Sequence, residues 1–307
     1  MKSHQMKGKK VLVTGATGYV GQNLVNSLVK KGYTVSVLTR KESPIFSNNK
    51  SINMIVGDIT DPINLPPDIN TIYHCAGVIY KLKELERVNV LGTKNIVEIA
   101  LRNNCQLIHL SSAGVLSSHN AYEWSKWRGE KIVLDGIKIG LKAHILRPTT
   151  IFGPGKNREG DSFFELVKSM RTGSYKNIGQ GIYNIVHVNE VVKAMLELSE
   201  ANIAYGGIYL VNNPIAFKDM DILVKNTPPA IARKTKTVSY PIAWLAALVL
   251  TLISFITHRK NPLTFSRLKA LTNTRAYSQD KILQAIHFKN TLPVEKYIRQ
   301  ICLDLFM

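Results

Sequence analysis

The stretch VLVTGATGYVG, Val11–Gly21, decides the fold of this 307-residue chain. An apolar run from Val11 to Val13 leads directly into three glycines spaced three residues apart. Glycine permits a sharp turn and lets another group come close to the backbone. A strand that delivers such a loop to the start of a helix is the arrangement that holds phosphate groups. The stretch therefore predicts a strand, a phosphate-binding loop and a helix.

The segments around this loop predict an α/β fold with a Rossmann-type doubly wound parallel sheet. Short β-branched runs alternate with longer segments of helical periodicity, as in buried parallel strands joined by helices. We expect residues 1–147 to form a dinucleotide-binding domain and residues 148–307 a smaller substrate-binding lobe, with the chain interleaving between the two. The expected strands are Lys9–Thr14, Thr34–Thr39, Ile52–Val56, Thr71–Cys75 and Gln106–Ser111, and the expected helices are Tyr19–Lys31 and Leu85–Asn103.

Each glycine of the loop has a separate expected role. Gly15 makes the turn, Gly18 lets a pyrophosphate lie against backbone N–H groups, and Gly21 lets the helix pack on the sheet. The alternative is a glycine-rich turn that binds nothing. The remaining loop residues expected to line the dinucleotide are Thr17, Tyr19 and Val20.

The ends of the second and third strands bear on the kind of dinucleotide. Enzymes that prefer NAD usually place an acidic residue after the second strand, whereas this chain has Arg40 and Lys41 there. A cationic pair suits a 2′-phosphate, so we expect NADP(H) rather than NAD(H); the alternative is that Arg40 is a solvated surface residue. Asp58, after the third strand, is expected to bind the adenine amino group, or else to serve as a turn or cap residue.

Three residues form a candidate proton relay. Tyr122 and Lys126 are four residues apart at the start of a predicted helix and share one face of it. A neighbouring ammonium stabilises a phenolate and lowers its pKa, and Lys126 is also placed to bind a ribose. Ser112 ends a predicted strand at the sheet edge where such folds bind ligands. The plain alternatives are a surface tyrosine beside a lysine and a serine that caps a turn.

Taken in order, the motifs resemble the extended short-chain dehydrogenase/reductase family. They are His74-Cys75-Ala76-Gly77, Asn89-Val90-Leu91-Gly92-Thr93, Ser111-Ser112, Tyr122 to Lys126, and Arg147-Pro148 through Gly153-Pro154. The resemblance implies that Ser112, Tyr122 and Lys126 are catalytic and that Asn89 supports the active site. It also implies a homodimer paired through the helices near Asn89 and Tyr122, and a substrate held between the sheet and the C-terminal lobe. Residues implied to line the dinucleotide are Gly15, Gly18, Gly21, Arg40, Asp58, Ile59, Ala76, Gly77, Tyr122, Lys126 and Pro148.

Departures from the family pattern narrow the reaction. Ala113 and Gly114 stand where dehydratases of the family carry acids, which argues against dehydration. No arginine that could clamp a diphosphate lies near Gly181–Val188. We expect a reductase acting on a ketone or secondary alcohol of a sugar-nucleotide or lipid-linked sugar-like substrate. The alternatives are an NAD-dependent nucleotide-sugar epimerase and a regulatory protein that binds a dinucleotide without turnover.

The formal charge of +19 calls for an anionic partner. After residue 230 the chain carries twelve basic residues against Asp280, Glu295 and Asp304. No nucleic-acid module accompanies them, so anionic lipid headgroups or a phosphorylated substrate are the expected partners. The three cysteines lack metal-ligand spacing, and no metal is expected. Because no apolar stretch of signal-peptide length precedes Val11, we expect a cytoplasmic protein.

A second apolar stretch, Pro241–Thr257, contains no charged residue. It is apolar around its whole circumference, so it must be buried in protein or in lipid. The favoured interpretation is a helix packed inside the substrate lobe. The alternatives are a helix in the interface of an anionic membrane, at its inner face, and a true span, for which its length is at the short limit.

Overall fold

A computed structural model describes residues 8–47, 49–66, 68–79, 81–117, 120–154, 162–228, 235–257, 261 and 263–306. The chain forms two compact units. The first unit comprises Met1–Thr149, Val188–Val211 and Gln279–Lys289. The second unit comprises Thr150–His187, Asn212–Ser278 and Asn290–Met307.

The first unit is built on a seven-stranded parallel sheet in the order β11-β6-β5-β4-β1-β2-β3. The strand order reverses between β1 and β4, and in such folds the crevice at this reversal, beyond the carboxyl ends of the strands, holds the ligand. The predicted α/β doubly wound sheet is confirmed. The strands are β1 Lys10–Thr14, β2 Thr34–Thr39, β3 Ile52–Val56, β4 Ile69–His74, β5 Gln106–Leu110, β6 Ala143–Pro148 and β11 Ile208–Val211.

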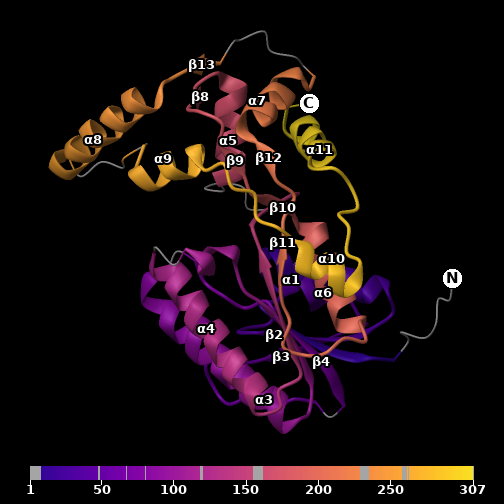
Figure 1. Ribbon diagram of the computed structural model, residues 1–307. Helices are drawn as coiled ribbons and strands as arrows, with labels where there is room; N and C mark the ends of the chain where they lie inside the picture. The colour runs from indigo at the N-terminus through magenta and orange to yellow at the C-terminus, as the bar shows by residue number, and fades with distance from the viewer. Residues whose placement is uncertain are drawn as a thin grey trace. The chain divides into compact units, whose positions relative to one another are not determined.

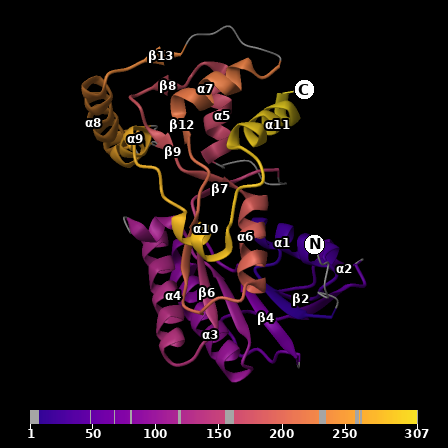
Figure 2. The ribbon, with the colours of Figure 1, turned by 45° about the vertical axis from the view of Figure 1, so that its right-hand side comes forward.

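Helices cover both faces of this sheet, so its central strands are buried on both sides (Figure 2). α1 packs on α6, and α3 packs on α4. The crossover from β1 to β2 runs toward one edge of the sheet, and the crossovers from β4 to β5 and from β5 to β6 run toward the other edge. Because each is right-handed, α1 lies on one face of the sheet and α3 and α4 on the other. The longer helices are α1 Tyr19–Lys30, α3 Gly92–Arg102, α4 Ala121–Lys138 and α6 Val188–Glu200; the shorter ones are α2 Pro44–Ser47, η1 Leu82–Glu84, η2 Glu86–Leu91, η3 Ala113–Leu116 and α10 Asp280–Ile286.

The expected helix Leu85–Asn103 is present but has two parts. Glu86–Leu91 forms a π-helix, and a regular α-helix follows from Gly92. A π-turn inside a helix usually occurs where a side chain or backbone group has a functional placement. Here the widened turn carries Asn89, whose side chain is fully engaged with neighbouring segments.

The second unit combines three two-stranded sheets with five helices over its described residues (Figure 1). Its core contains Phe152, Phe163, Met170 and Tyr297, with the ring of His187 stacked on Tyr297 at 3.8 Å between centroids. The helices are α5 Ser162–Thr172, α7 Phe217–Asn226, α8 Tyr240–Thr257, α9 Phe265–Thr272 and α11 Val294–Phe306; the strands are β7 Thr150–Phe152, β8 Lys176–Asn177, β9 Ile182–Tyr183, β10 Ile185–His187, β12 Ile215–Ala216 and β13 Lys236–Thr237.

The predicted apolar helix exists as α8, but the expectation that it packs inside the lobe is wrong. Only Ala243 and Ala247 of this helix are buried, and Phe255 is 82% exposed. α9 and Ile178 pack against the side of α8 that carries Ala243 and Ala247, so most of the apolar surface of α8 has no protein cover among the described residues. By length and composition α8 is also the one helix of the described chain that could cross a membrane. Of the basic residues expected near its ends, Lys236 is exposed, while Lys234, Arg259 and Lys260 lie outside the described residues.

Candidate active site

The glycine loop turns as tightly as its sequence predicts. Gly15 adopts a φ of +66°, and a Cβ there would lie 2.5 Å from the backbone nitrogen of Ala76. A Cβ on Gly21 would lie 2.1 Å from the carbonyl oxygen of Gly15, so α1 packs directly on the loop. Gly18 is the N-cap of α1, and no side chain caps this helix end. The first-turn N–H groups of α1 and the glycines of the loop thus fit a pyrophosphate.

The other predicted loop residues differ in exposure. Thr17 is exposed and its carbonyl accepts a hydrogen bond of 2.6 Å from the Gln22 side chain, which braces the loop against α1. Tyr19 is half-buried. Val20 is buried and contributes to the core beneath the loop. Of the three predicted residues, Thr17 is thus the one that the loop presents to solvent.

Arg40 and Asp58 lie at the carboxyl ends of β2 and β3, as predicted. Arg40 is exposed. Asp58 accepts hydrogen bonds from the Thr60 backbone nitrogen at 3.0 Å and hydroxyl at 2.9 Å, and pairs with Arg87 at 3.0 Å. Burial alone would raise the pKa of Asp58, but these hydrogen bonds and the charges of Arg87 and Arg40 lower it. The turn role of Asp58 is therefore present in the structure, and its adenine contact stays a prediction.

Two further residues predicted to line the dinucleotide are buried, one against a helix and one within the sheet. The side chain of Ile59 is buried against Gly92 of α3, where a Cβ would approach it to 2.5 Å. Any contact of Ile59 with a dinucleotide must therefore use its backbone. Pro148 is buried at the end of β6, in register with Val211 of β11.

Asn89 connects the loop after β4 to the first turn of α4. Its Oδ1 accepts from the Val78 nitrogen, and its Nδ2 donates to the Val78 carbonyl, both at 2.9 Å. Nδ2 also donates to the Ser125 hydroxyl at 2.8 Å, and that hydroxyl donates to the Tyr122 carbonyl at 2.7 Å. Because these bonds fix both segments, Asn89 holds the segments of Gly77 and Tyr122 at a fixed position relative to each other.

Lys126 lies one turn after Tyr122 and is buried beside the end of β5. Its Nζ donates to the Leu110 carbonyl at 2.7 Å and lies 4.0 Å from the position of a Cβ on Gly77. Burial lowers the pKa of Lys126 to about 8, against smaller opposite effects of Cys75 and Glu130. Tyr122 is half-buried on the same helix face. The sequence-predicted pair therefore sits where the carboxyl end of β5 meets the loop after β4.

Ser112 follows β5 and is half-buried. Its hydroxyl accepts a hydrogen bond of 3.1 Å from the Gly114 nitrogen and caps the short helix Ala113–Leu116. An oxygen that accepts from a backbone N–H retains its own proton for donation elsewhere. The capping role and the predicted catalytic role are thus compatible.

Sequence reasoning assigned no role to Glu130, which is buried one turn after Lys126 on α4. Glu130 accepts hydrogen bonds from the Ser111 hydroxyl at 2.7 Å and from Arg147 Nε at 3.0 Å, with a second bond from the Arg147 guanidinium. These contacts tie the carboxyl ends of β5 and β6 to α4. The signal that could have identified Glu130 is its spacing of four residues after Lys126, on the same face of the helix.

A second unassigned element is a buried chain of hydrogen bonds through His74 of β4. Thr93 donates from its hydroxyl to the Asn89 carbonyl at 2.7 Å, so at 3.1 Å it must accept from His74 Nε2–H. His74 Nδ1 then accepts from the Thr14 hydroxyl at 2.7 Å. Burial, reinforced by the charge of Lys126, lowers the pKa of His74 to about 3, consistent with this neutral tautomer. The chain joins the residue before Gly15 to the π-turn of Asn89.

Close packing fixes the same π-turn from the other side. A Cβ on Gly129 of α4 would lie 2.5 Å from the Asn89 carbonyl oxygen and 3.3 Å from the Thr93 hydroxyl. Only a glycine lets the two helices come this close. The Asn89 carbonyl is thus held between the Thr93 hydroxyl and the backbone of α4.

With this geometry established, comparisons with known proteins identify the family. The family model described as the NAD dependent epimerase/dehydratase family matches residues 11–211. The chain belongs to this family. It is an enzyme family of the extended short-chain dehydrogenase type, with epimerases, dehydratases and dehydrogenases among its members.

Named relatives show how varied this family is. The chain is 29% identical over 246 residues to a decarboxylating sterol-4-alpha-carboxylate 3-dehydrogenase of Mus musculus, which covers 69% of the chain and 66% of that enzyme. It is 24% identical over 302 residues to an N-acetyl-alpha-D-glucosaminyl-diphospho-ditrans,octacis-undecaprenol 4-epimerase of Escherichia coli O157:H7, covering 89% and 88%. An uncharacterized membrane protein of Methanocaldococcus jannaschii is 24% identical over 78% of both chains.

A solved structure agrees with the family fold. UDP-glucuronic acid 4-epimerase from Bacillus cereus in complex with NAD superimposes with a TM-score of 0.71, covering 97% of this chain and 100% of that one at 16% identity. This likeness is one of fold. The family model and the fold thus agree.

Proposed function

We propose that this chain is a reductase that converts a ketone to a secondary alcohol with NADPH. The observation that carries the proposal is the buried Lys126, hydrogen-bonded to the Leu110 carbonyl one turn from Tyr122. A dinucleotide-binding protein that only senses its ligand has no need for an ammonium buried at this energetic cost. The glycine loop and the uncapped start of α1 fit the pyrophosphate of the dinucleotide.

The chain's own residues account for proton delivery. When bound, the dinucleotide supplies the hydride that adds to the carbonyl carbon. The Tyr122 hydroxyl gives its proton to the carbonyl oxygen, so that hydride and proton together make the alcohol. The Lys126 ammonium stabilises the phenolate left behind, and solvent then reprotonates it. Ser112 donates its hydroxyl hydrogen to the substrate oxygen and orients it, while Asn89 holds the segment that carries Tyr122.

Tyr122→Phe tests this assignment. Loss of the transferred proton is expected to lower kcat for ketone reduction by about a thousandfold. The affinity for NADPH, measured by quenching of its fluorescence, should change less than twofold, because the phenol's main role is in the transition state. Full activity of Tyr122→Phe would remove Tyr122 from the relay.

Arg40 supports NADP(H) over NAD(H). It is exposed at the end of β2, where a cation can meet a 2′-phosphate, and Lys41 beside it is also exposed. Native mass spectrometry of the purified protein should find NADP, or exchangeable binding of NADPH tighter than that of NADH. Arg40→Ala should reduce the affinity for NADPH about tenfold and leave that for NADH unchanged. Tightly retained NAD that does not exchange would instead favour epimerisation.

We propose a substrate with a lipid portion, such as a lipid-linked sugar-like ketone, handled at the inner face of the membrane by a cytoplasmic enzyme. The names of a sterol dehydrogenase and an undecaprenol-linked epimerase among the relatives support this class, as does the exposed apolar helix α8. We also propose a homodimer through η2 and α4. Leu91 and Trp124 are exposed on these helices and offer an apolar contact surface.

An epimerase is the second candidate. The undecaprenol-linked 4-epimerase matches nearly the whole chain, and the same relay would serve both directions of hydride transfer. Oxidation of added NADPH by simple ketones separates the two, because a reductase exchanges its dinucleotide at each turnover and an epimerase does not. The same assay separates the reductase from a regulatory protein that binds a dinucleotide without turnover.

A further inference from the structure

Helix α8 presents an apolar surface that is unusual for a soluble protein. Seven of its aliphatic and phenylalanine side chains are between 46% and 82% exposed. No charged residue occurs anywhere in the helix. Contiguous exposed apolar surface of this kind marks an interaction site rather than ordinary protein surface. We call this set the α8 surface: Ile242, Leu245, Val249, Leu252, Ile253, Phe255 and Ile256.

The two threonine hydroxyls of α8 donate hydrogen bonds within the helix. The hydroxyls of Thr251 and Thr257 each donate at 2.7 Å to the carbonyl four residues earlier. Asn261 donates to the Thr251 hydroxyl at 2.9 Å. A helix whose backbone and hydroxyl groups are internally bonded can enter hydrocarbon without leaving a polar group unpaired.

α8 and α9 form an antiparallel hairpin. After α8 the chain returns so that Asn261 meets Thr251, and Leu268 of α9 packs with Ala243 and Ala247 near the start of α8. Figures 1 and 2 both show the two helices side by side. The small alanine stripe is used for this protein contact, which leaves the bulky α8 surface outward.

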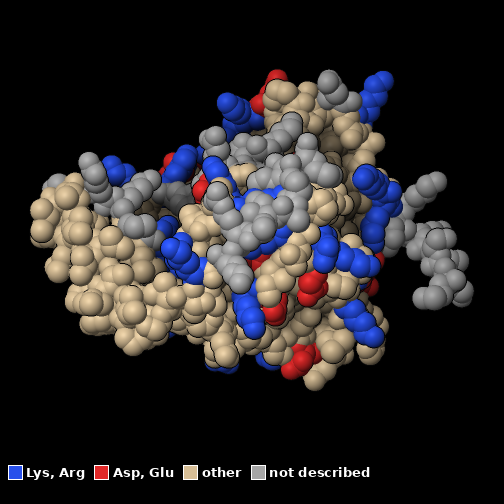
Figure 3. Space-filling model, turned by 90° about the horizontal axis from the view of Figure 1, so that it is seen from above, with Lys and Arg blue, Asp and Glu red and all other residues tan. Residues whose placement is uncertain are grey.

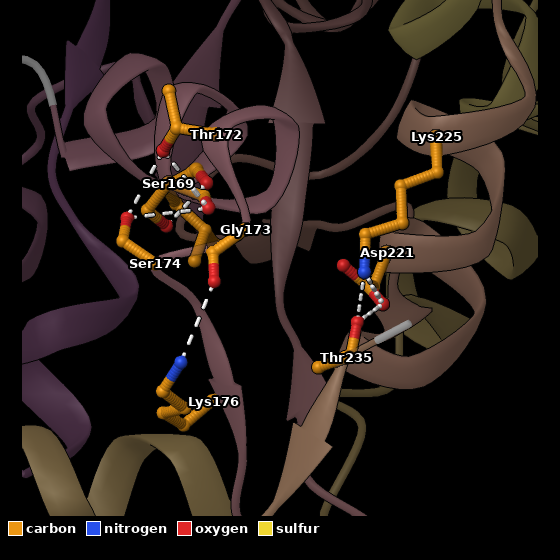
Figure 4. Close-up of polar contacts among 9 residues, drawn as sticks. Ser169, Thr172, Gly173, Ser174, Lys176, Asp221, Lys225 and Thr235 are labelled. Atoms are coloured by element: carbon orange, nitrogen blue, oxygen red, sulfur yellow. Dashed lines mark hydrogen bonds and ion pairs between the residues drawn. The ribbon is translucent and has the colours of Figure 1, made fainter. Parts of the chain in front are cut away.

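The segment before α8 is tied to the second unit. Lys236–Thr237 pairs with Lys176–Asn177, and the Val238 nitrogen donates to the Asn177 carbonyl at 2.9 Å. Thr235 bonds to Asp221, which also pairs with Lys225 at 3.1 Å on α7 (Figure 4). This flank therefore remains with the folded unit.

The segment after α9 is tied to the same unit. The Asn273 carbonyl accepts from the Ile182 nitrogen at 2.7 Å, and the Arg275 carbonyl accepts from Asn184 at 3.0 Å. Both flanks of the hairpin thus return to the sheets of one folded unit. A helix that crossed a bilayer would need a second apolar segment to bring the chain back, and the described residues after Thr257 contain none. This topology favours a helix with both ends on one side of the membrane.

Positive charge surrounds the base of the hairpin. Lys236 precedes α8, and Arg267, Lys269 and Arg275 are exposed on and after α9. Figure 3 shows the uncharged surface of α8 at the left with basic side chains beside it. Exposed apolar side chains bordered by lysine and arginine match the interface of an anionic membrane, where apolar groups enter the acyl region and cations meet the headgroups.

We propose that α8 inserts monotopically into one leaflet of an anionic bilayer, with both ends of the α8–α9 hairpin on the same side. The occupant of the α8 surface is therefore lipid, and the basic residues at the hairpin base select anionic headgroups. This inference deepens the proposed membrane location and rests on it, but it does not depend on which reaction the enzyme catalyses. A helix of 18 residues is about 27 Å long and can lie along the interface over its whole length.

Flotation of the full chain with phosphatidylcholine vesicles, with and without phosphatidylglycerol, tests the lipid contact. The wild-type protein should float with the anionic vesicles, and less in high salt. The double variant F255E/I256E should reduce the floated fraction about tenfold, because both side chains belong to the α8 surface. Ile139→Glu is the matched control: Ile139 is 73% exposed in the first unit and its replacement should change nothing.

Labelling with a membrane-impermeant maleimide tests the topology. Ser239→Cys lies before α8 and Lys269→Cys on α9, and both positions are exposed. On bound vesicles both cysteines should react from outside to the same extent. Protection of one of them alone would show a span and overturn the proposal. Wild-type protein that stays unbound, or that uses the α8 surface to form a dimer lost in F255E/I256E, would overturn it as well.

Activity separates this inference from the proposed reaction. With a water-soluble ketone and no vesicles, F255E/I256E should keep the wild-type kcat within twofold, because the α8 surface has no part in the proton relay. A protein that floats but oxidises no NADPH would contradict the reductase and leave the membrane inference standing. A protein that reduces ketones but does not float would contradict the membrane inference and leave the reductase standing.

Discussion

Two helices of equal length, α4 and α8, differ in which side chains they bury and which they expose. Both have 18 residues. α4 buries the polar side chains of Ser125, Lys126 and Glu130. α8 instead exposes large apolar ones, among them Leu252 and Phe255. Neither pattern follows the rule that apolar residues are inside and polar ones outside.

The difference shows that burial depends on the partners that the fold supplies. Lys126 and Glu130 of α4 have definite partners at the carboxyl edge of the sheet: Leu110 for Lys126, and Ser111 and Arg147 for Glu130. Ser125 bonds to Asn89 and to the Tyr122 carbonyl. In the described residues α8 packs against α9 and Ile178 along its alanine side, and its bulky side chains remain exposed. A polar group survives burial when it is bonded, and an apolar face remains exposed when its partner is absent from the chain.

Lys126→Met removes the buried ammonium of α4 and should have the largest effect. We expect kcat to fall about a thousandfold, because the phenolate loses its ammonium partner. At pH 7 the free energy of unfolding should nevertheless rise by about 2 kcal/mol, since an ammonium whose pKa is depressed to about 8 is costly to bury, less the lost hydrogen bond to Leu110.

The difference in unfolding free energy between Lys126→Met and wild type should depend on pH. The pKa of Lys126 is about 8 in the fold against an ordinary 10.5, so its burial costs most below pH 8 and the cost disappears as the pH rises to 10.5. Urea unfolding at pH 7 and at pH 10 should therefore show the gap between Lys126→Met and wild type closing. A gap of constant size would mean that the lysine is not buried as a charged group.

Two variants of His74 test the buried polar groups near α4 and should have intermediate effects on kcat and on dinucleotide affinity. His74→Asn keeps a group near Nδ1 that can accept from Thr14, and should lower kcat about tenfold with little change in dinucleotide affinity. His74→Gln keeps a donor near Nε2 for Thr93, and should show the opposite split, with weaker dinucleotide binding. Titration calorimetry and steady-state kinetics measure the two effects. Equal losses in both variants would reduce His74 to a packing residue.

Ile253→Ser tests the exposed apolar side chains of α8 and should have the smallest effect. Because Ile253 is 47% exposed, we expect the free energy of unfolding in detergent-free buffer to change by less than about 0.5 kcal/mol. Val133→Ala, at a fully buried position of α4, should cost about 2 kcal/mol and serves as the contrast. Denaturant unfolding compares them. A large loss for Ile253→Ser would show that α8 is covered by protein in solution.

The sequence by itself determined the sheet, the glycine loop and the places of Ser112, Tyr122 and Lys126, because these depend on local periodicity and on short spacings within single elements. The five predicted strands recur with shifts of two residues or fewer at their ends. The same local reasoning placed Asn89 on a helix, but the π-turn around it was not predictable. That turn is stabilised by Val78 and Ser125, which are distant in the chain.

Only the tertiary structure decided which side chains meet across elements. Glu130 and His74 acquire roles through Arg147, Thr14 and Thr93, whose proximity comes from strand order rather than from spacing in the sequence. For α8 the sequence left burial, interface and span open, since all three suit an apolar helix of this length. The exposed α8 surface and the return of both flanks to one unit separate these possibilities, because topology restricts where the ends of a helix can lie.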